Sequence, residues 1–170
     1  MEFCENCVYG KQKRFIFLRV GKQKKSEKLE LVHIDVWGPA QVQYLGGSNY
    51  YVTCIGDATR KTWFYCIRKK YDVFDTFKKW KSLAENETRK RLKCLKYDNG
   101  GEYYSKDFES YCSQNGICRE NTIFGTPQES DVSERINRTI MENARCMILH
   151  AGFPLQFWVN AVNTSVYLIN

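Results

Sequence analysis

The alternation of apolar and polar residues predicts five short strands in this chain. Each predicted strand is rich in β-branched and aromatic residues, and turn signals such as Gly46-Gly47-Ser48-Asn49 and Asn99-Gly100-Gly101 separate them. The five runs cover residues 29–36, 50–57, 62–69, 91–97 and 117–122. The first three follow one another through short turns, so we expect them to form an antiparallel meander.

Apolar residues at helical spacing predict four helices after the meander. Segment 71–85 places aromatic and aliphatic residues every three or four positions. Segment 105–116 begins at a serine suited to capping and ends at a glycine. The last two helices cover residues 130–150 and the segment after Pro154. In this order the first and fourth strands can lie side by side and parallel, so we predict an α/β fold, a five-stranded mixed sheet flanked by helices.

The composition fits one folded domain with a basic appendage. Of the 170 residues, 43% are hydrophobic, which is enough for a core, and the formal net charge of +7 favours a polyanionic partner. Residues 1–28 are basic and lack a sustained period, so we assign them to an appendage and linker. Residues 29–170 form the predicted domain, and its final helical pattern continues to Asn170, as expected of a fragment.

Cysteine usage and hydropathy indicate an intracellular protein with no membrane partner. The sequence has no signal peptide and no apolar run long enough to cross a bilayer. Six of the eight cysteines fall in strand-like or helical patterns, where we expect free thiols. Cys4 and Cys7 have zinc-ligand spacing, but the two histidines, His33 and His150, lie far downstream. We therefore expect half of a zinc site and no bound Zn²⁺.

Three acidic residues stand out because of their places in the predicted elements. Asp35 ends the first strand, Asp98 ends the fourth, and Glu134 lies in the first turn of the long helix. Each alone has an ordinary explanation, as a turn residue or as a helix-dipole partner. Together, carboxylates converging from two strand ends and a helix can hold two Mg²⁺ ions about 3.5–4 Å apart and promote phosphoryl transfer.

Basic residues near these acids are candidate contacts for DNA. Arg138 and Arg145 share a helical stripe with Glu134, where they can meet phosphates or support the acid. Arg135 and Lys96 complete the set of predicted DNA-binding residues.

Six stretches of the sequence carry a specific family pattern. They are CENCVYGKQKRFIF (4–17), LELVHIDVWGP (29–39), LGGSNYYVTCIGDATRKTWFY (45–65), LKYDNGGEYYSKDFESYC (95–112), the segment 125–149, and FPLQFWVNAVNTSVYLIN (153–170). In these stretches the chain resembles the integrase of Copia-type long-terminal-repeat retrotransposons. The resemblance runs from the end of the zinc-binding pre-integrase module through the catalytic core.

The resemblance implies a ribonuclease H-like fold in which Asp35, Asp98 and Glu134 hold two Mg²⁺ or Mn²⁺ ions. It implies 3′-end processing, in which water attacks, and strand transfer, in which the 3′-OH of the element attacks host DNA. It also implies a double-stranded DNA partner, a homo-oligomer on DNA and a nuclear site of action. By the same resemblance, residues 1–28 are a remnant of the zinc-binding module with its linker, and residues 29–170 are the catalytic core.

Two positions depart from the family pattern. The family commonly has Asn-Gly before the final acid, where this chain has Ser130-Asp131 after Glu129. It commonly has two adjacent Asp residues where this chain has Gly56-Asp57, and we expect a structural role for Asp57. The changed loop and the incomplete zinc ligands leave open a catalytically inactive remnant that only binds nucleic acid or a protein. A ribonuclease H-type nuclease acting on RNA–DNA hybrids is a third alternative.

Overall fold

The computed structural model describes residues 25–98, 100–121 and 131–170, and it contains every predicted strand and helix. The strands are β1 Leu31–Trp37, β2 Tyr50–Gly56, β3 Thr62–Ile67, β4 Cys94–Tyr97 and β5 Cys118–Asn121. The α-helices are α2 Val73–Thr88, α3 Lys106–Gln114, α4 Asp131–Ala151 and α5 Trp158–Ile169. Short 3₁₀ helices are η1 Lys70–Asp72, η2 Gly101–Tyr103 and η3 Leu155–Phe157.

The strands form one mixed sheet in the order β3-β2-β1-β4-β5. β1 pairs antiparallel with β2, and β2 with β3, which confirms the predicted meander. β1 pairs in parallel with β4, and β4 in parallel with β5. The first and fourth strands are therefore neighbours, as predicted from the order of elements, and β1 lies at the centre of the sheet.

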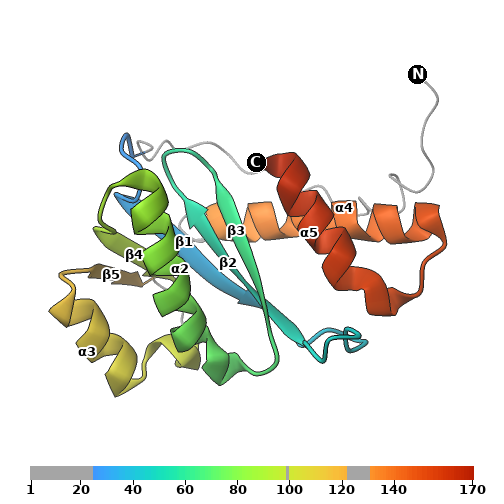
Figure 1. Cartoon of the computed structure of the whole chain (residues 1–170), viewed down its shortest axis with the longest axis horizontal. Coiled ribbons are helices and arrows are strands. Elements are labelled where there is room, and N and C mark those ends of the chain that lie inside the picture. The colour runs from blue at the N-terminus through green and yellow to red at the C-terminus, as the bar shows by residue number, and fades with distance from the viewer. Residues whose placement is uncertain (1–24, 99, 122–130) are drawn as a thin grey trace.

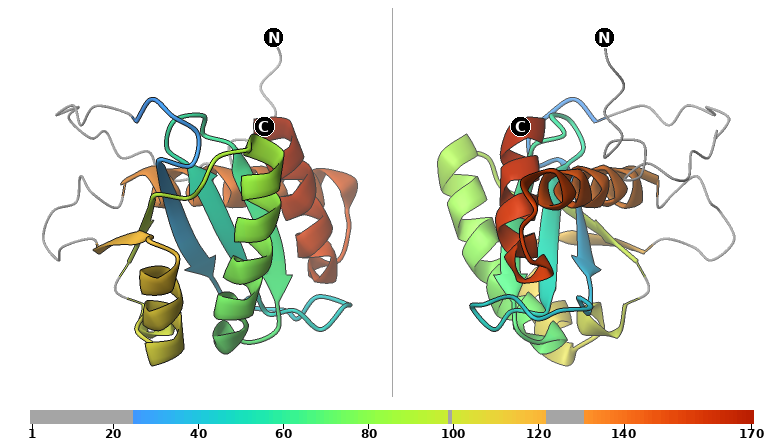
Figure 2. Two further views of the ribbon diagram at one scale, coloured as in Figure 1. Left: turned by 60° about the vertical axis from the view of Figure 1, so that its left-hand side comes forward. Right: turned by 90° about the vertical axis from the view of Figure 1, so that its right-hand side faces the viewer.

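One face of the sheet packs against α2 and α3 (Figures 1 and 2). Because side chains alternate along a strand, Val32 and Ile34 of β1 both point to this face. They belong to one buried cluster with Phe77 and Trp80 of α2 and Phe108 of α3. The clustered aromatic rings hold α2 and α3 against the sheet. In the sequence β4 lies between these two helices, so its two ends are held in place with them.

The opposite face packs against α4, and α5 covers α4 and contacts β3 (Figure 2). Tyr51 of β2 points to this side and is buried with Ile140 of α4 and with Trp158 and Val162 of α5. Trp158 also donates a hydrogen bond from Nε1 to the Val42 carbonyl at 3.0 Å. Layered helices on both faces of the sheet confirm the predicted α/β class, and α4 is held directly over β1 and β2.

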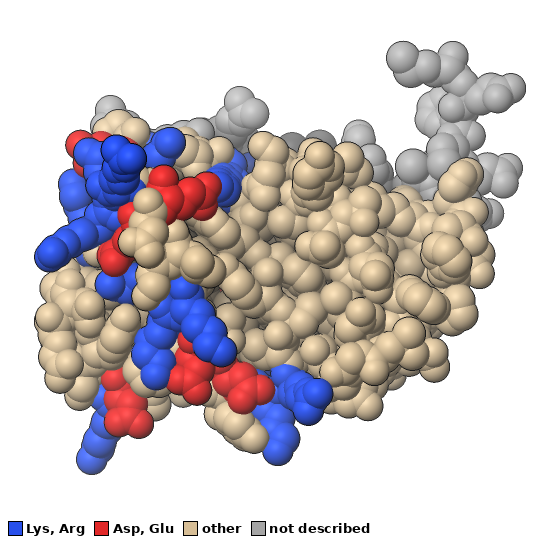
Figure 3. Space-filling view, viewed as in Figure 1, with Lys and Arg blue, Asp and Glu red and all other residues tan. Residues whose placement is uncertain are grey.

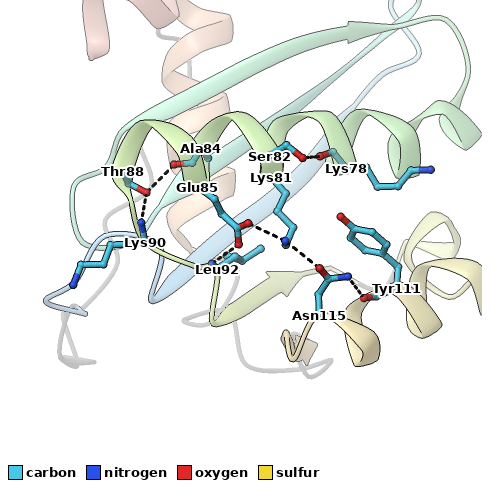
Figure 4. A network of polar contacts seen from close by, with 10 residues as sticks. All are labelled: Lys78, Lys81, Ser82, Ala84, Glu85, Thr88, Lys90, Leu92, Tyr111 and Asn115. Atoms are coloured by element: carbon cyan, nitrogen blue, oxygen red, sulfur yellow. Dashed lines mark hydrogen bonds and ion pairs between the residues drawn. The ribbon is translucent and has the colours of Figure 1, made fainter.

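Lys81 is a buried lysine of α2. Its side chain is only 10% exposed, and Nζ contacts Glu85 Oε2 at 3.0 Å and Asn115 Oδ1 at 3.3 Å (Figure 4). Glu85 Oε1 also accepts a hydrogen bond from the Leu92 amide at 2.9 Å. This network ties α2 to the segment that enters β4 and to the end of α3, so it fixes the strand that leads to Asp98.

Ser105 caps α3 as predicted, because its side chain accepts a hydrogen bond from the Phe108 amide at 3.2 Å. Replacing Ser105 by Ala leaves that amide without its partner, so we expect a loss of about 1 kcal/mol in the free energy of unfolding. Urea denaturation of the two proteins measures this difference. Ser113→Ala, an exposed change in the same helix, is the control and should cost less. Equal stability of the two variants would contradict a capping role.

Charged side chains are unevenly distributed over the surface of the described part. In the view of Figure 3, Lys and Arg gather over α2 and the turns beside it, whereas the area over α5 is uncharged.

Six cysteines of the described part are free, as predicted: Cys54, Cys66, Cys94, Cys112, Cys118 and Cys146. Cys4 and Cys7 lie outside the described residues. None of the described helices is long and apolar enough to cross a membrane.

Candidate active site

Parallel pairing of β1 and β4 brings Asp35 and Asp98 together. The register pairs His33 with Lys96, and the two aspartates come two residues later on each chain segment, on the same face of the sheet. Asp35 lies within β1, and Asp98 directly follows β4. Burial raises the pKa of Asp35 most, and the negative charge of Asp98 on the neighbouring strand raises it further.

Asn137 connects α4 to this pair of strands. Its Nδ2 donates to Asp35 Oδ2 at 2.7 Å, and its Oδ1 accepts from Thr53 Oγ1 at 3.1 Å. The Val36 amide donates to the other oxygen of Asp35 at 2.8 Å. Asn137 is buried and fixes both the carboxylate of Asp35 and the position of α4 over the sheet. The sequence reasoning missed it, although a polar residue three positions before buried Ile140 on the same helical stripe was a usable signal.

Glu134 lies one helical turn before Asn137, so it occupies the end of α4 that approaches Asp35. Its side chain is 62% exposed, and Oε1 pairs with Arg138 Nη2 at 3.0 Å. Within the described ranges, no group of three His, Cys, Asp or Glu residues is placed to hold a metal ion. Asp35 and Asp98 thus lie on neighbouring strands, and Glu134 is paired with an arginine. The catalytic role of all three acids stays a prediction.

The predicted DNA-binding residues have different surroundings. Arg135 and Arg145 are exposed on α4, and Arg138 is held by Glu134. Lys96 is only 6% exposed within β4, so it lies under the surface rather than on it. None of these contacts with DNA is tested by the fold. The altered loop residues Glu129 and Ser130 lie outside the described part.

Asp35 is an acid in an unfavourable environment for its charge. Burial raises its pKa most, and repulsion from Asp98 and Glu102 raises it further. Hydrogen bonds from Asn137 and from the Val36 amide oppose the shift, but the pKa remains above its usual range. Asp35 and Asp98 form no ion pair with Lys or Arg in the described part, so a divalent cation between them would remove the repulsion. The donor set thus suits Mg²⁺ or Mn²⁺, which prefer carboxylate oxygen.

The raised pKa of Asp35 predicts how stability depends on pH without metal. An acid whose pKa is raised by folding destabilises the folded state as pH rises from the unfolded value, about 4, through the folded value. Asp98→Asn removes one source of repulsion, so this loss with rising pH should become smaller. Urea denaturation in EDTA between pH 4 and 7 measures it, with the exposed Asp107→Asn as control. Parallel pH profiles for the protein and Asp98→Asn would contradict this interpretation.

Asp57 has the structural role expected of it. Its Oδ1 contacts His33 Nε2 at 3.1 Å and Arg60 Nη1 at 3.0 Å, and its Oδ2 accepts from the Lys25 amide at 2.9 Å. Burial would raise the pKa of Asp57, but these donors lower it. Burial also lowers the pKa of His33. The pair joins β1 to the β2–β3 turn, so His33 is a buried structural residue.

Comparison with known proteins shows the family to which the chain belongs. No protein-family model matches the chain. It is 48% identical over 167 residues to the "Retrovirus-related Pol polyprotein from transposon TNT 1-94" of Nicotiana tabacum, covering 98% of the chain and 12% of that polyprotein. Polyproteins from transposons RE2 and RE1 of Arabidopsis thaliana are 35% and 32% identical, and the chain spans 11% of each.

A chain of the simian T-cell lymphotropic virus intasome, solved with the PP2A regulatory subunit B56 gamma, has the same fold. The TM-score is 0.68 at 15% sequence identity, over 92% of this chain and 54% of that one. This likeness, together with the five-stranded mixed sheet of the chain, confirms the ribonuclease H-like fold. The chain therefore belongs to the retrovirus-related Pol polyproteins of Copia-type retrotransposons, of which it represents a short segment with an integrase-like fold.

Proposed function

We propose that the chain is the catalytic core of a retrotransposon integrase, which inserts element DNA into host DNA in a divalent-metal-dependent reaction. The observation that carries this proposal is that the parallel pairing of β1 and β4 places Asp35 and Asp98 side by side, beneath the end of α4 that bears Glu134. The membership of the chain in retrotransposon polyproteins supports the choice of DNA as substrate. Residues 29–170 form this core in the proposal, and residues 1–28 are the remnant of the zinc-binding module.

Asp35, Asp98 and Glu134 would hold the two Mg²⁺ or Mn²⁺ ions. Bound there, the ions would activate the attacking oxygen and stabilise the leaving oxygen of a phosphodiester. Asn137 orients Asp35 by its hydrogen bond. Arg138, which pairs with Glu134 in the metal-free chain, would release this acid and bind a DNA phosphate when metal and DNA are present. We expect no Zn²⁺ in this segment.

The proposed reaction has two steps. In each of them one oxygen attacks the phosphorus of a phosphodiester and a 3′-oxygen leaves. In 3′-end processing, a water oxygen forms a bond to phosphorus and the 3′-oxygen of the element leaves as a hydroxyl. In strand transfer, that 3′-oxygen attacks host DNA, and the host 3′-oxygen leaves with the proton. The enzyme forms no covalent intermediate, so its residues act by positioning and charge neutralisation.

The substrate fits an open surface better than a small-molecule pocket. Two hollows of the described part, of about 560 and 420 Å³, are lined by residues around Gly47 and around Arg60. Neither includes Asp35, Asp98 or Glu134. A duplex lying across α4 could reach Arg135 and Arg145, while Lys96 adds positive potential from below.

The partners follow from the same proposal. Double-stranded DNA, both element ends and host target, is the proposed substrate, and a homo-oligomer on DNA is the proposed working form. The likeness to an intasome chain and the uncharged surface of α5, where Tyr167 is 81% exposed, support an assembly. The proposed place of action is intracellular, in the nucleus, with no membrane partner.

Disintegration of a branched DNA substrate in Mn²⁺ tests the proposal. It measures the core reaction without an intact zinc module. The chain should resolve the branch, and Glu134→Gln should not. Glu142→Gln, on the same helix two turns along, is the matched control and should retain activity. Activity that survives in Glu134→Gln would contradict the assignment of the third acid.

A second candidate is an inactive remnant that only binds nucleic acid or a protein partner. Two observations favour it: Glu134 is paired with Arg138, and no three acids of the described part are placed to hold a metal ion. Salt-sensitive DNA binding without metal-dependent chemistry in the folded chain would select this alternative. Cleavage of an RNA–DNA hybrid in place of branched DNA would instead select the ribonuclease H-type nuclease.

A further inference from the structure

Cys94 and Cys118 lie directly opposite each other on neighbouring strands. β4 and β5 run parallel, and their register pairs Cys94 with Cys118. Residues opposite each other in a sheet send their side chains to the same face. The two thiols therefore leave the sheet side by side, although η2 and α3 separate them in the sequence.

The two thiols point to the face of the sheet on which α4 packs. Leu95, which follows Cys94, is buried in the cluster beneath α2 and α3. Because side chains alternate along a strand, Cys94 points to the other face, and Cys118 points there with it. Cys94 is only 9% exposed, whereas Cys118 is exposed to solvent. A reagent in solution can therefore reach the pair through Cys118.

The remaining described cysteines lie in other parts of the fold. Cys54 and Cys112 are buried in the cluster beneath α2 and α3, on the opposite face. Cys66 lies on β3, at the far edge of the sheet from β5. Cys146 belongs to the second half of α4, whose buried residues pack against α5. Among the cysteines of the described ranges, Cys94 is therefore the partner that the sheet places against β5.

The spacing of the two strands suits a disulfide. Neighbouring strands lie about 4.8 Å apart, and disulfides join residues whose Cα atoms are about 4.4–6.8 Å apart. The Cβ atoms must approach each other, because relaxed disulfides hold them about 3.8 Å apart. β5 has four residues and lies at the edge of the sheet, so it can move toward β4. A bond that needs this movement is strained and is more easily reduced than an ordinary structural disulfide.

The two thiols differ in their surroundings. Burial raises the pKa of the Cys94 thiol most, and Glu120 and the neighbouring Cys118 raise it further. Cys94 therefore stays protonated at neutral pH, and the exposed Cys118 meets reagents first. An accessible cysteine beside a second one that can resolve its oxidised form is the usual arrangement of redox-sensitive thiols.

We propose that Cys94 and Cys118 are a redox-sensitive pair, which a small-molecule disulfide such as oxidised glutathione converts into a reversible disulfide bond. The Cys118 thiolate attacks one sulfur of the glutathione disulfide, and one glutathione leaves and takes up a proton. Cys94 then gives up its proton, attacks the Cys118 sulfur and displaces the second glutathione. Two protein thiols are oxidised, and one glutathione disulfide is reduced to two thiols. This site is independent of the proposed DNA chemistry.

Mass spectrometry of the folded chain after incubation with oxidised glutathione tests the proposal. The measurement uses the chain with Cys4→Ser and Cys7→Ser, because these two residues are the other closely spaced cysteines of the sequence. The chain should lose two hydrogen atoms, and non-reducing digestion should give one cross-linked peptide that joins Cys94 to Cys118. Cys118→Ser, a change at an exposed position, should lose this peptide, whereas Cys66→Ser, the control, should keep it.

Circular dichroism before and after oxidation checks that each variant is folded. Cys94→Ala should stop at the mixed disulfide and gain one glutathione on Cys118, and dithiothreitol should remove both the adduct and the cross-link. Glutathione on Cys118 with Cys94 still free in the otherwise unchanged chain would overturn the proposal. So would two thiols that both stay free, or a cross-link that forms only after unfolding in urea.

Discussion

Replacing Asp35 by Asn is expected to abolish DNA joining and to leave the fold intact. Asn at this position can still accept one hydrogen bond, from Asn137 or from the Val36 amide, and it no longer repels Asp98. A neutral amide cannot offset the charge of a divalent cation or of the transition state. We expect disintegration activity to fall at least about 10³-fold, the scale of losing one group that stabilises developing charge.

The assay for Asp35→Asn is single-turnover disintegration in Mn²⁺, with thermal unfolding in EDTA to show that the fold is retained. Asp107→Asn, at an exposed position of α3, removes the same charge away from β1 and is the control. Activity within about 10-fold of the unchanged chain would place the chemistry elsewhere, because losing a carboxylate required for catalysis should lower the activity much more than that.

Replacing Asn137 by Leu is expected to damage both stability and activity. The substitution keeps the approximate size of the side chain but leaves Asp35 Oδ2 and the Thr53 hydroxyl without their buried partner. Each unsatisfied group costs about 1–3 kcal/mol, so we expect a loss of about 2–4 kcal/mol in the free energy of unfolding. Activity should fall about 10- to 100-fold, because both Asp35 and the turn that bears Glu134 lose their link.

Urea denaturation and disintegration measure the two effects. Asn143→Leu, a partly exposed change on the same helix, is the matched control. Thr53→Val combined with Asn137→Leu should cost less than the two single changes added together, because one hydrogen bond is shared between them. Additive costs, or equal stability of Asn137→Leu and Asn143→Leu, would contradict the role of Asn137 as the connection between α4 and the sheet.

The periodicity of the sequence predicted most of the fold because its layers depend on local pattern. Alternating residues such as Val32 and Ile34 determine which face of β1 is buried, and the order of elements allows the parallel pairing of β1 and β4 that the structure has. Ser105 shows the same consistency at a helix start. Asp35 and Asp98 were found together for this reason, since both follow from strand order and register.

The remaining features could not be predicted because they depend on contacts between distant segments. Asn137 is 102 residues from Asp35 in sequence, so its place on a buried helical stripe does not show which residue it binds. In the sequence Lys81 looks like an exposed helix residue, and only its contacts with Glu85 and Asn115 in the structure explain why it is buried. Cys94 and Cys118 lie far apart in the sequence, and only the register of β4 and β5 shows that they face each other.

The position of Mn²⁺ in crystals of the chain with branched DNA would test the central claim most directly. The account predicts anomalous scattering peaks bound by the carboxylates of Asp35 and Asp98, with Glu134 turned away from Arg138 to join them. Mn²⁺ bound only at other carboxylates, with none at Asp35 and Asp98 in crystals that contain DNA, would contradict it.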